Sequence, residues 1–278
     1  MPNNLNSFQQ NIYSQFGEDG IIRRLFEIIP TEKESWCVEF GAWDGVHLSN
    51  THNLIKNKGW KGILIEGKKK RFKDLVNNYS GNTNVFLLNT YVSFEGRNKL
   101  DDLLENTPIP KNFDLLSIDV DGNDYHIWNS LMNYRPKAVI IEFNPTIPSD
   151  ICFIQERSQS VNHGNSLLAI VRLAKLKGYE LIATTKCNAF FVEQGYYPLF
   201  GIADNTINAL SKPFKTPRIF QLYDGTIVLS DEFNLVWSKK KVNKYKLQMI
   251  PRYLRFYDVN TTFRYKIRKF ILNYFYRC

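Results

Sequence analysis

The sequence predicts an α/β fold in which a mostly parallel sheet is covered by helices on both faces. Short apolar runs alternate with amphipathic helical patterns over residues 12–195, as expected for parallel strands joined by helical crossovers. Several runs are apolar almost without interruption, which is typical of strands buried on both faces. The last two runs, 179–184 and 189–192, are too close for a crossover and predict an antiparallel hairpin at the sheet edge.

The elements can be assigned in chain order. The patterns predict a helix that ends at residue 29 before Pro30, a strand from residue 36, a helix over 47–58, a strand over 61–67 and a basic helix over 68–79. They then predict strands over 84–92, 113–119 and 138–143, a short helix over 100–104 and a helix over 165–177. With the final hairpin, the result is a seven-stranded, Rossmann-like sheet within a domain of residues 1–200.

The C-terminal part of the chain differs from this domain in its high positive charge. Residues 239–278 contain 12 Lys or Arg against one acid, Asp258, whereas the other 238 residues carry a net charge of −2. We therefore expect residues 201–278 to be a basic extension that contacts a membrane surface, the acceptor or another copy of the chain. Its alternating basic and aromatic residues, at 252–257 and 263–275, suit an anionic membrane or stacked nucleic acid, although a plain helical appendage fits equally well.

Composition and leader patterns bear on localisation. Hydrophobic residues make up 44% of the chain and charged residues 23%, as in ordinary soluble proteins. Because the first thirty residues lack a signal-peptide pattern, a cytoplasmic protein is expected, either free or peripheral at the inner face of a membrane. The four cysteines are scattered, which favours reduced thiols over a disulfide framework or a zinc site.

The stretch from Trp36 to Gly45 is the main candidate for a ligand site. A short apolar run ends in Glu39, and Gly41 and Gly45 then enclose Trp43 and Asp44. Glycines at such a turn let backbone amides approach a ligand closely, and an acid at the strand end can bind a cationic or hydroxyl-bearing group.

Acidic residues recur at the ends of the predicted strands. Glu39, Glu66, Asp119 and Glu142 all hold this position, and in an open α/β sheet ligands bind outside the carboxyl ends of the strands. Glu66 follows the glycine turn by about 20 residues, where a nucleotide-binding sheet places the acid that accepts hydrogen bonds from ribose. The four acids therefore predict one crevice that binds an adenosine-containing cofactor.

The order of residues in the turn discriminates between two such cofactors. A dinucleotide requires the pyrophosphate turn G-x-G-x-x-G, whereas this chain has Glu39-x-Gly41-x-x-x-Gly45, with Trp43 where a phosphate needs room. A carboxylate before the turn repels a pyrophosphate but tolerates a sulfonium and an amino group. S-adenosylmethionine is therefore preferred to NAD.

These segments resemble the motifs of class I S-adenosylmethionine-dependent methyltransferases. The resemblance rests on Glu39 to Gly45, Glu66, the run 118–125 and the run 141–145. Residues 13–20 and 164–167 make the chain most similar to FkbM-type and related sugar O-methyltransferases. The resemblance covers residues 12–195, and it implies methyl transfer to a sugar hydroxyl of a surface glycan or a lipid-linked saccharide.

The resemblance also implies roles for individual residues. The positions that would contact the cofactor are Gln15, Glu39, Gly41, Ala42, Asp44, Gly45, Asn50, Glu66, Gly67, Val92 and Asp119. Within this set, the turn would line the methionine half, Glu66 would bind ribose, and the backbone near Val92 would border adenine. Asp119 and Asp121 would face the sulfonium and the acceptor, although Asp121 stands where the family usually has Glu.

A sugar hydroxyl is a weak acid, so its methylation requires a base or a metal ion. Asp119, Asp121, Glu142 and Asn144 are oxygen ligands suited to Mg or Mn, and a metal-free site could use the same groups to orient hydroxyls. His163 is the preferred histidine for a base, ahead of His126.

Other functions remain possible from the residues alone. The basic extension would suit a nucleic-acid methyltransferase, but Asn144-Pro145-Thr146 lacks the second proline and the aromatic residue of the amino-methylating N-P-P-[YF] motif, so a nucleic acid is an unlikely partner. A non-catalytic nucleotide-binding module is the other alternative. The sequence does not decide the oligomeric state.

Overall fold

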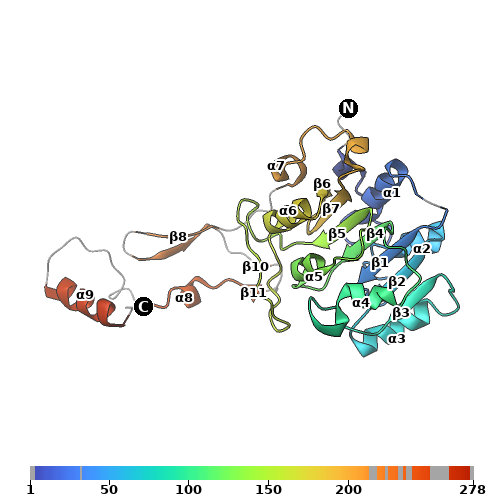
Figure 1. The fold of residues 1–278 in the computed structure, drawn as a ribbon. Coiled ribbons are helices and arrows are strands. Elements are labelled where there is room, and N and C mark those ends of the chain that lie inside the picture. The colour runs from blue at the N-terminus through green and yellow to red at the C-terminus, as the bar shows by residue number, and fades with distance from the viewer. Residues whose placement is uncertain are drawn as a thin grey trace. The chain divides into compact units, whose positions relative to one another are not determined.

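The computed structural model describes residues 4–31, 33–212, 218–222, 225–230, 234–235, 240–250 and 263–275. The chain forms two compact units, residues 1–214 and 215–278. The first contains a seven-stranded sheet of order β3-β2-β1-β4-β5-β7-β6 (Figure 1). Its strands are β1 (Trp36–Phe40), β2 (Lys61–Ile65), β3 (Val85–Leu88), β4 (Leu115–Ile118), β5 (Ala138–Glu142), β6 (Tyr179–Thr184) and β7 (Asn188–Glu193).

Strand directions confirm the predicted sheet. β1 to β5 pair in parallel, and β7 runs antiparallel to both β5 and β6. The turn of residues 185–187 between β6 and β7 is too short for a helical crossover, so the chain reverses direction there.

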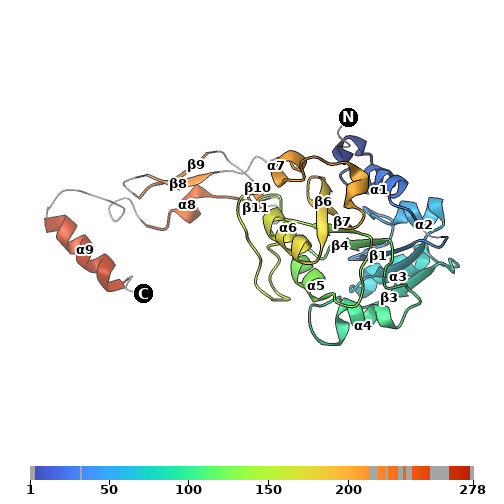
Figure 2. The same cartoon turned by 45° about the horizontal axis from the view of Figure 1, so that its top comes forward.

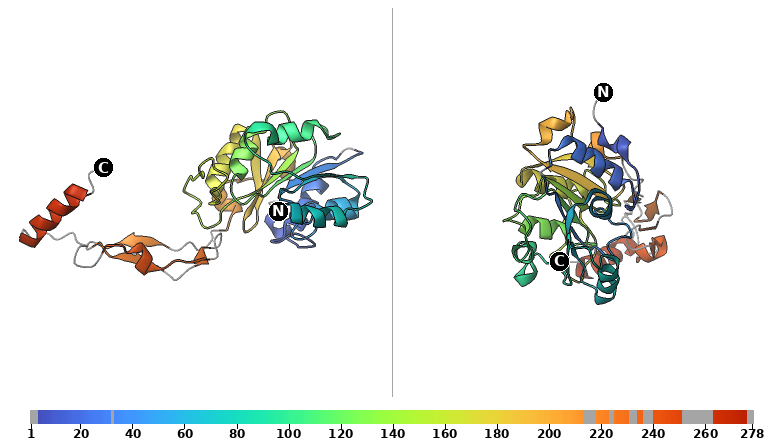
Figure 3. Two further views of the ribbon diagram at one scale, coloured as in Figure 1. Left: turned by 90° about the horizontal axis from the view of Figure 1, so that it is seen from below. Right: turned by 90° about the vertical axis from the view of Figure 1, so that its right-hand side faces the viewer.

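Helices cover both faces of the sheet (Figures 2 and 3). α1 (Glu18–Ile28), α2 (His52–Lys58) and α3 (Lys69–Asn78) pack on one face, and α4 (Leu100–Glu105), α5 (Asp124–Ser130) and α6 (Leu167–Leu176) pack on the other. Successive side chains of each central strand enter opposite clusters: Cys37 and Leu64 face the first set of helices, and Val38 and Ile63 face the second. The carboxyl edge of the strands is left to the loops that build the site.

Two predicted elements are shorter than expected. α2 begins at His52 instead of residue 47, because residues 44–51 form a loop in which Leu48 has φ 60°. β3 ends at Leu88 instead of residue 92, and the chain beyond it turns across the carboxyl edge of β2, where Asn89 Nδ2 donates to the backbone oxygen of Glu66 (2.7 Å). Both differences lie at the carboxyl edge.

The first unit extends past the expected boundary at residue 200. The helix α7 (Ile207–Leu210) is anchored by Asn6 Nδ2 and Thr184 Oγ1, which both donate to the backbone oxygen of Leu210 (2.6 and 2.8 Å). Three 3-10 turns, Leu5–Phe8, Gly96–Asn98 and Tyr197–Phe200, complete this unit.

The second unit contains small elements. They are β8 (Ile219–Gln221), β9 (Ile227–Leu229), β10 (Asn234–Leu235), β11 (Lys240–Lys241), α8 (Lys244–Leu247) and α9 (Phe263–Phe275). β8 and β9 form an antiparallel hairpin, as do β10 and β11. The basic aromatic run at 252–257 lies outside the described residues.

Candidate functional site

The carboxyl ends of β1 and β4 form the topological switch point of the sheet. From β1 the chain moves outward to β2 and β3, and it then returns to place β4 on the other side of β1. The loops after β1 and β4 therefore run to opposite sides at this edge, which is where open α/β sheets bind their ligands.

Gly41 brings the two strand ends into contact. Its φ is +74°, and a Cβ atom built on it would overlap the backbone oxygen of Asp119. No other residue fits this position without separating the ends of β1 and β4, because an L side chain is both strained and sterically blocked there. The backbone of the turn thus lies directly beside the first residue after β4.

The rest of the turn is fixed by its own hydrogen bonds. Ala42 N donates to the backbone oxygen of Ile65 at the end of β2 (3.2 Å), and Gly45 N donates to that of Ala42 (2.7 Å). The carboxylate of Asp44 accepts from the backbone N–H groups of Val46 and His47 (2.9 and 2.7 Å). Asp44 therefore shapes the turn locally, in addition to any contact with a ligand.

Glu39 is held by the loop that follows β1. Its buried carboxylate accepts hydrogen bonds from Ser49 Oγ (2.6 Å), Asn50 N (2.9 Å) and Thr51 Oγ1 (2.6 Å). Asn50 in turn donates through Nδ2 to Ser117 Oγ on β4 (3.0 Å). Glu39 and Asn50 therefore hold the loop after β1 against the strand ends, and the contact of Glu39 with a cofactor stays a prediction.

Glu66 joins the glycine turn to the end of β2. One carboxylate oxygen accepts from Trp43 N (3.0 Å) and the other from Lys68 N (2.6 Å). A carboxylate offers about four acceptor positions, so two remain for ribose hydroxyls. Only 4% of Glu66 is exposed, and the side chain is already held in one orientation.

Tyr91 and Asn89 are residues of this region that the sequence interpretation missed. A Cβ atom on Gly67 would overlap the ring of Tyr91, whose exposed fraction is 62%. Val92, by contrast, packs its side chain into the hydrophobic core and can offer a ligand only its backbone. An exposed aromatic ring beside Glu66 is suited to stacking on a base. The signal in the sequence is the aromatic residue immediately before Val92.

The segment containing Gln15 also reaches the carboxyl edge. Buried Glu18 accepts from Thr185 Oγ1 (2.7 Å) and Asn188 Nδ2 (3.0 Å), and Asn188 pairs with Glu142 at the end of β5. Gln15 itself is exposed, with its backbone oxygen accepting from Asn11 Nδ2 (2.9 Å). This segment therefore borders the crevice on the side of β6 and β7.

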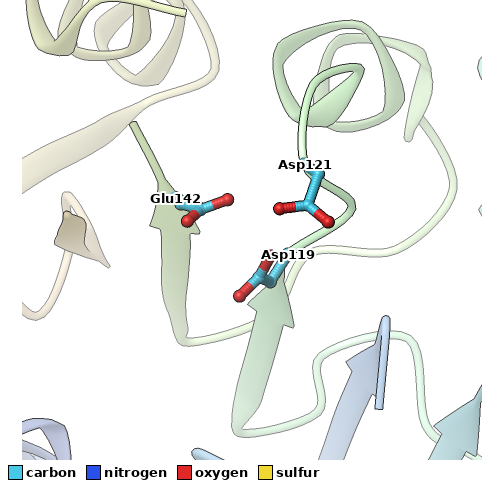
Figure 4. Close-up of side chains that lie close together, drawn as sticks. All are labelled: Asp119, Asp121 and Glu142. Carbon is cyan, nitrogen blue, oxygen red and sulfur yellow. The ribbon is translucent and has the colours of Figure 1, made fainter. Parts of the chain in front are cut away.

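Asp119, Asp121 and Glu142 form an acidic cluster on the other side of the switch point (Figure 4). They come from the end of β4, the loop after it and the end of β5, and each has a carboxylate oxygen within 4.8 Å of the others. Figure 4 shows the three carboxylates pointing toward one another. Asp121 has φ 60°, a conformation that side chains other than glycine adopt only where their surroundings impose it.

Desolvation and mutual repulsion raise the pKa values of two carboxyl groups in the cluster. Desolvation by the surrounding protein, followed by repulsion from Asp124 and Asp121, raises the pKa of Asp119 to about 7, although solvent still reaches the carboxylate. Desolvation and the nearby Asp119 also raise the pKa of Glu142. Glu142 Oε2 is buried and has no hydrogen-bond partner among the described residues. Such a cluster is stabilised by a bound proton, cation or hydroxyl donor.

Asn144 does not join the acidic cluster as a free ligand. Its Oδ1 accepts from Thr146 N and Oγ1 (2.9 and 2.5 Å), and its Nδ2 donates to the backbone oxygen of His163 (2.6 Å). The amide therefore holds the loop of residues 145–166, and its expected role as a metal ligand loses support.

The two histidines proposed as bases differ in their surroundings. His126 is buried and its Nε2 bonds to the backbone oxygen of Gln155 (2.8 Å), which makes it a structural group. His163 lies on the loop of residues 145–166 with an exposed side chain, and its backbone is held by Gln155 and Asn144. Of the two histidines, only His163 exposes its ring to solvent.

Gln155 is the centre of a buried polar network that the sequence interpretation missed. Its Nε2 donates to Asn123 Oδ1 and the backbone oxygen of Val161 (3.1 and 3.0 Å), and its Oε1 accepts from His163 N and Gly164 N (2.9 and 3.0 Å). Only 1% of Gln155 is exposed. The network attaches the loop of residues 145–166 to the loop that carries Asp121.

Replacing Gln155 with leucine is therefore expected to destabilise the protein by about 3 kcal/mol, since four polar groups lose their partner, two in buried and two in partly buried hydrogen bonds. The measurement is the free energy of unfolding in urea. Gln159→Leu is the matched control, because this exposed glutamine of the same loop makes one long hydrogen bond, to Ser93 Oγ (3.4 Å). Equal stabilities of the two variants would contradict the role of Gln155.

No family model matches the sequence, and no curated protein matches it. Solved structures with a related fold do match. The N-terminal domain of EvdMO1 with SAH bound has a TM-score of 0.42 and 14% identity, covering 63% of this chain and 80% of that one. A SAM-dependent methyltransferase from Aquifex aeolicus has a TM-score of 0.39 and 12% identity, covering 69% and 96%. The CurJ carbon methyltransferase has a TM-score of 0.43 and 7% identity, covering 66% and 56%.

These scores and identities are low, so the likenesses carry no argument about activity. The fold class itself follows from the strand order and directions of this chain.

Proposed function

We propose that this protein is an S-adenosylmethionine-dependent methyltransferase. The proposal rests on one observation at the carboxyl edge of the sheet. The glycine turn after β1 is hydrogen-bonded to Glu66, a carboxylate at the end of β2 that is held in one orientation. Gly41 places the turn against Asp119, and Glu66 holds the backbone of Trp43 while keeping acceptor positions for ribose. This arrangement suits an adenosine-containing ligand whose other end lies between β1 and β4.

The charges around the crevice favour a cationic ligand. Asp119, Asp121 and Glu142 lie beyond the turn and would repel a pyrophosphate, whereas a sulfonium and an amino group are attracted to them. The guanidinium of Arg71 lies over the indole of Trp43, 3.9 Å from its ring centre, so this side chain packs beside the turn. The acidic cluster and the absence of the G-x-G-x-x-G order in the turn support S-adenosylmethionine over NAD.

We further propose that the acceptor is a sugar hydroxyl of a surface glycan or lipid-linked saccharide. Methyl transfer is an in-line displacement, in which the acceptor oxygen must lie close to the methyl group and lose its proton. Asp119 and Asp121 are exposed carboxylates that can accept hydrogen bonds from an acceptor hydroxyl and take its proton. His163, on the loop over the strand ends, is the second candidate base.

The acidic cluster also fits a divalent cation. Three oxygen-donor side chains lie within 4.8 Å of one another, and Glu142 contributes a buried oxygen without a partner. Asp119, Asp121 and Glu142 would hold Mg²⁺ or Mn²⁺, which prefer such ligands. When bound, the ion would polarise the acceptor oxygen.

Calorimetry with S-adenosylmethionine, S-adenosylhomocysteine and NAD tests the cofactor. We expect the first two to bind and NAD to give no heat, because only the first two lack a diphosphate. Glu66→Gln should weaken binding of both by about tenfold, since a charge-assisted hydrogen bond to ribose is lost. Heat with NAD alone would refute the proposal.

Manganese binding tests the metal separately. We expect the wild-type protein to bind one Mn²⁺ in electron paramagnetic resonance titrations, and Glu142→Gln to weaken the affinity at least about tenfold. Asp150→Asn, at an exposed acid outside the cluster, should leave it unchanged. If wild type and Glu142→Gln bind Mn²⁺ equally, the cluster is not the metal site.

The acceptor is tested with methyl-labelled S-adenosylmethionine. Label should enter a polysaccharide or glycolipid fraction and be released as methylated sugar on acid hydrolysis. Incorporation into RNA or DNA instead would contradict the sugar acceptor while leaving the cofactor proposal intact.

A further inference from the structure

The second unit exposes an unusual amount of apolar surface. In the parts of residues 215–278 that the structure describes, no hydrophobic side chain is buried. Large exposed side chains occur on the hairpin, around α8 and on α9: Ile219, Phe220, Leu222, Tyr245, Leu247, Met249, Ile250, Phe263, Ile267, Phe270, Ile271 and Tyr274. Exposed apolar clusters of this kind mark an interaction surface.

Four apolar side chains of α9 lie on one face. Phe263, Ile267, Phe270 and Tyr274 follow one another at intervals of four, three and four residues, which aligns them along a helix. Their exposed fractions are 77%, 43%, 72% and 75%. The rings of Phe270 and Tyr274 stack with centroids 6.3 Å apart, so the face is continuous.

The same helix is strongly basic. Residues 263–275 contain two arginines and two lysines and no acid, and the side chains of Lys266 and Lys269 are exposed. Residues 239–278 together carry a net charge of +11. A partner must therefore accept apolar side chains and present negative charge at the same time.

Charge and side-chain type discriminate between the possible partners. A second copy of the chain would place two segments of high positive charge together, which is unfavourable. A nucleic acid would match the charge and could stack on Phe270 and Tyr274, but it offers nothing to Ile267 and Ile271. An anionic lipid surface satisfies both requirements, because acyl chains take the apolar face and headgroups neutralise the lysines and arginines.

We infer that residues 215–278 attach the protein to an anionic bilayer surface, with α9 lying in the headgroup region and its Phe263–Tyr274 face toward the acyl chains. Among the described residues, no helix combines the length and apolarity needed to cross a bilayer.

The full chain should be tested by co-sedimentation with vesicles of phosphatidylcholine alone or with phosphatidylglycerol at a ratio of 7:3. We expect the bound fraction, expressed as a partition coefficient, to be about tenfold higher on the anionic vesicles and to fall as salt is raised. Equal partitioning onto both vesicles, or retention by neither, would overturn the inference.

Two double variants test whether vesicle binding depends on the α9 face or on exposed apolar side chains anywhere on the protein. Ile267→Ser with Phe270→Ser should abolish binding to the anionic vesicles, whereas Met132→Ser with Leu176→Ser should not. Met132 and Leu176 are matched controls, since they are 78% and 85% exposed on the first unit. Both double variants should still bind S-adenosylmethionine, which shows that they are folded.

A single-stranded RNA oligonucleotide tests nucleic acid as the alternative partner of this surface. Displacement of the chain from anionic vesicles by a substoichiometric amount of a 20-nucleotide RNA would assign the surface to nucleic acid and refute the lipid proposal. Continued vesicle binding in its presence supports the proposal.

Discussion

The Asp119→Asn protein is expected to be more stable than the wild type and nearly inactive. Asp119 lies within 4.8 Å of Asp121 and Glu142, so removing its charge relieves repulsion in the folded state. A gain of about 1 kcal/mol would raise the melting temperature by about 2–4 °C in a domain of this size. Methyl transfer should fall by about 100-fold or more, because a group that orients or deprotonates the acceptor is lost.

Differential scanning calorimetry and label transfer from S-adenosylmethionine measure the two effects on the same protein. Asp150→Asn should change neither, since this exposed acid lies outside the cluster. His163→Ala is the informative companion: a similar loss of transfer without any gain in stability would make His163 the base. An Asp119→Asn protein that keeps full transfer would remove Asp119 from the reaction.

The Gly41→Ala protein is expected to lose both stability and cofactor binding. The added Cβ would overlap the backbone oxygen of Asp119, which is part of a strand end and cannot rotate away. The ends of β1 and β4 would have to separate, at a cost of about 3 kcal/mol or more, including the strain at φ +74°. Because the cofactor is proposed to lie between these ends, we expect its affinity to fall by at least about tenfold.

Gly59→Ala is the matched control for this change. Gly59 has φ +69°, but a Cβ atom there meets nothing within 4 Å. This variant should lose only the strain of the backbone conformation, about 1 kcal/mol, and should bind S-adenosylmethionine normally. If the two alanine variants unfold at the same temperature, the contact between Gly41 and Asp119 does not carry the energy assigned to it.

The sequence was sufficient for the sheet and for the edge of the sheet at which the acidic residues lie. Apolar runs and helical periodicity report which side chains are buried, and burial in a parallel sheet determines the number and direction of the strands. Since the strands are parallel, their ends meet at one edge, and the positions of Glu66, Asp119 and Glu142 at strand ends were enough to predict that all three lie at this edge.

Only the tertiary structure decided which of those polar groups are already engaged. Glu39 is occupied by Ser49, Asn50 and Thr51, and Asn144 by Thr146 and His163, whereas the Glu142 Oε2 atom has no partner among the described residues. Neither residue type nor spacing distinguishes these cases, because hydrogen-bond partners depend on loop conformation.

Gln155 shows why the hydrogen-bond partners of polar residues could not be predicted from the sequence. It is one polar residue in a loop without periodicity, yet it bonds to Asn123, 32 residues earlier in the chain. Hydrophobic periodicity is local and can be read along the sequence, whereas the satisfaction of a buried polar group requires coordinates of residues that are distant in the chain. The sequence alone therefore determined which edge of the sheet carries the acidic residues, and only the tertiary structure decided which of them already have hydrogen-bond partners.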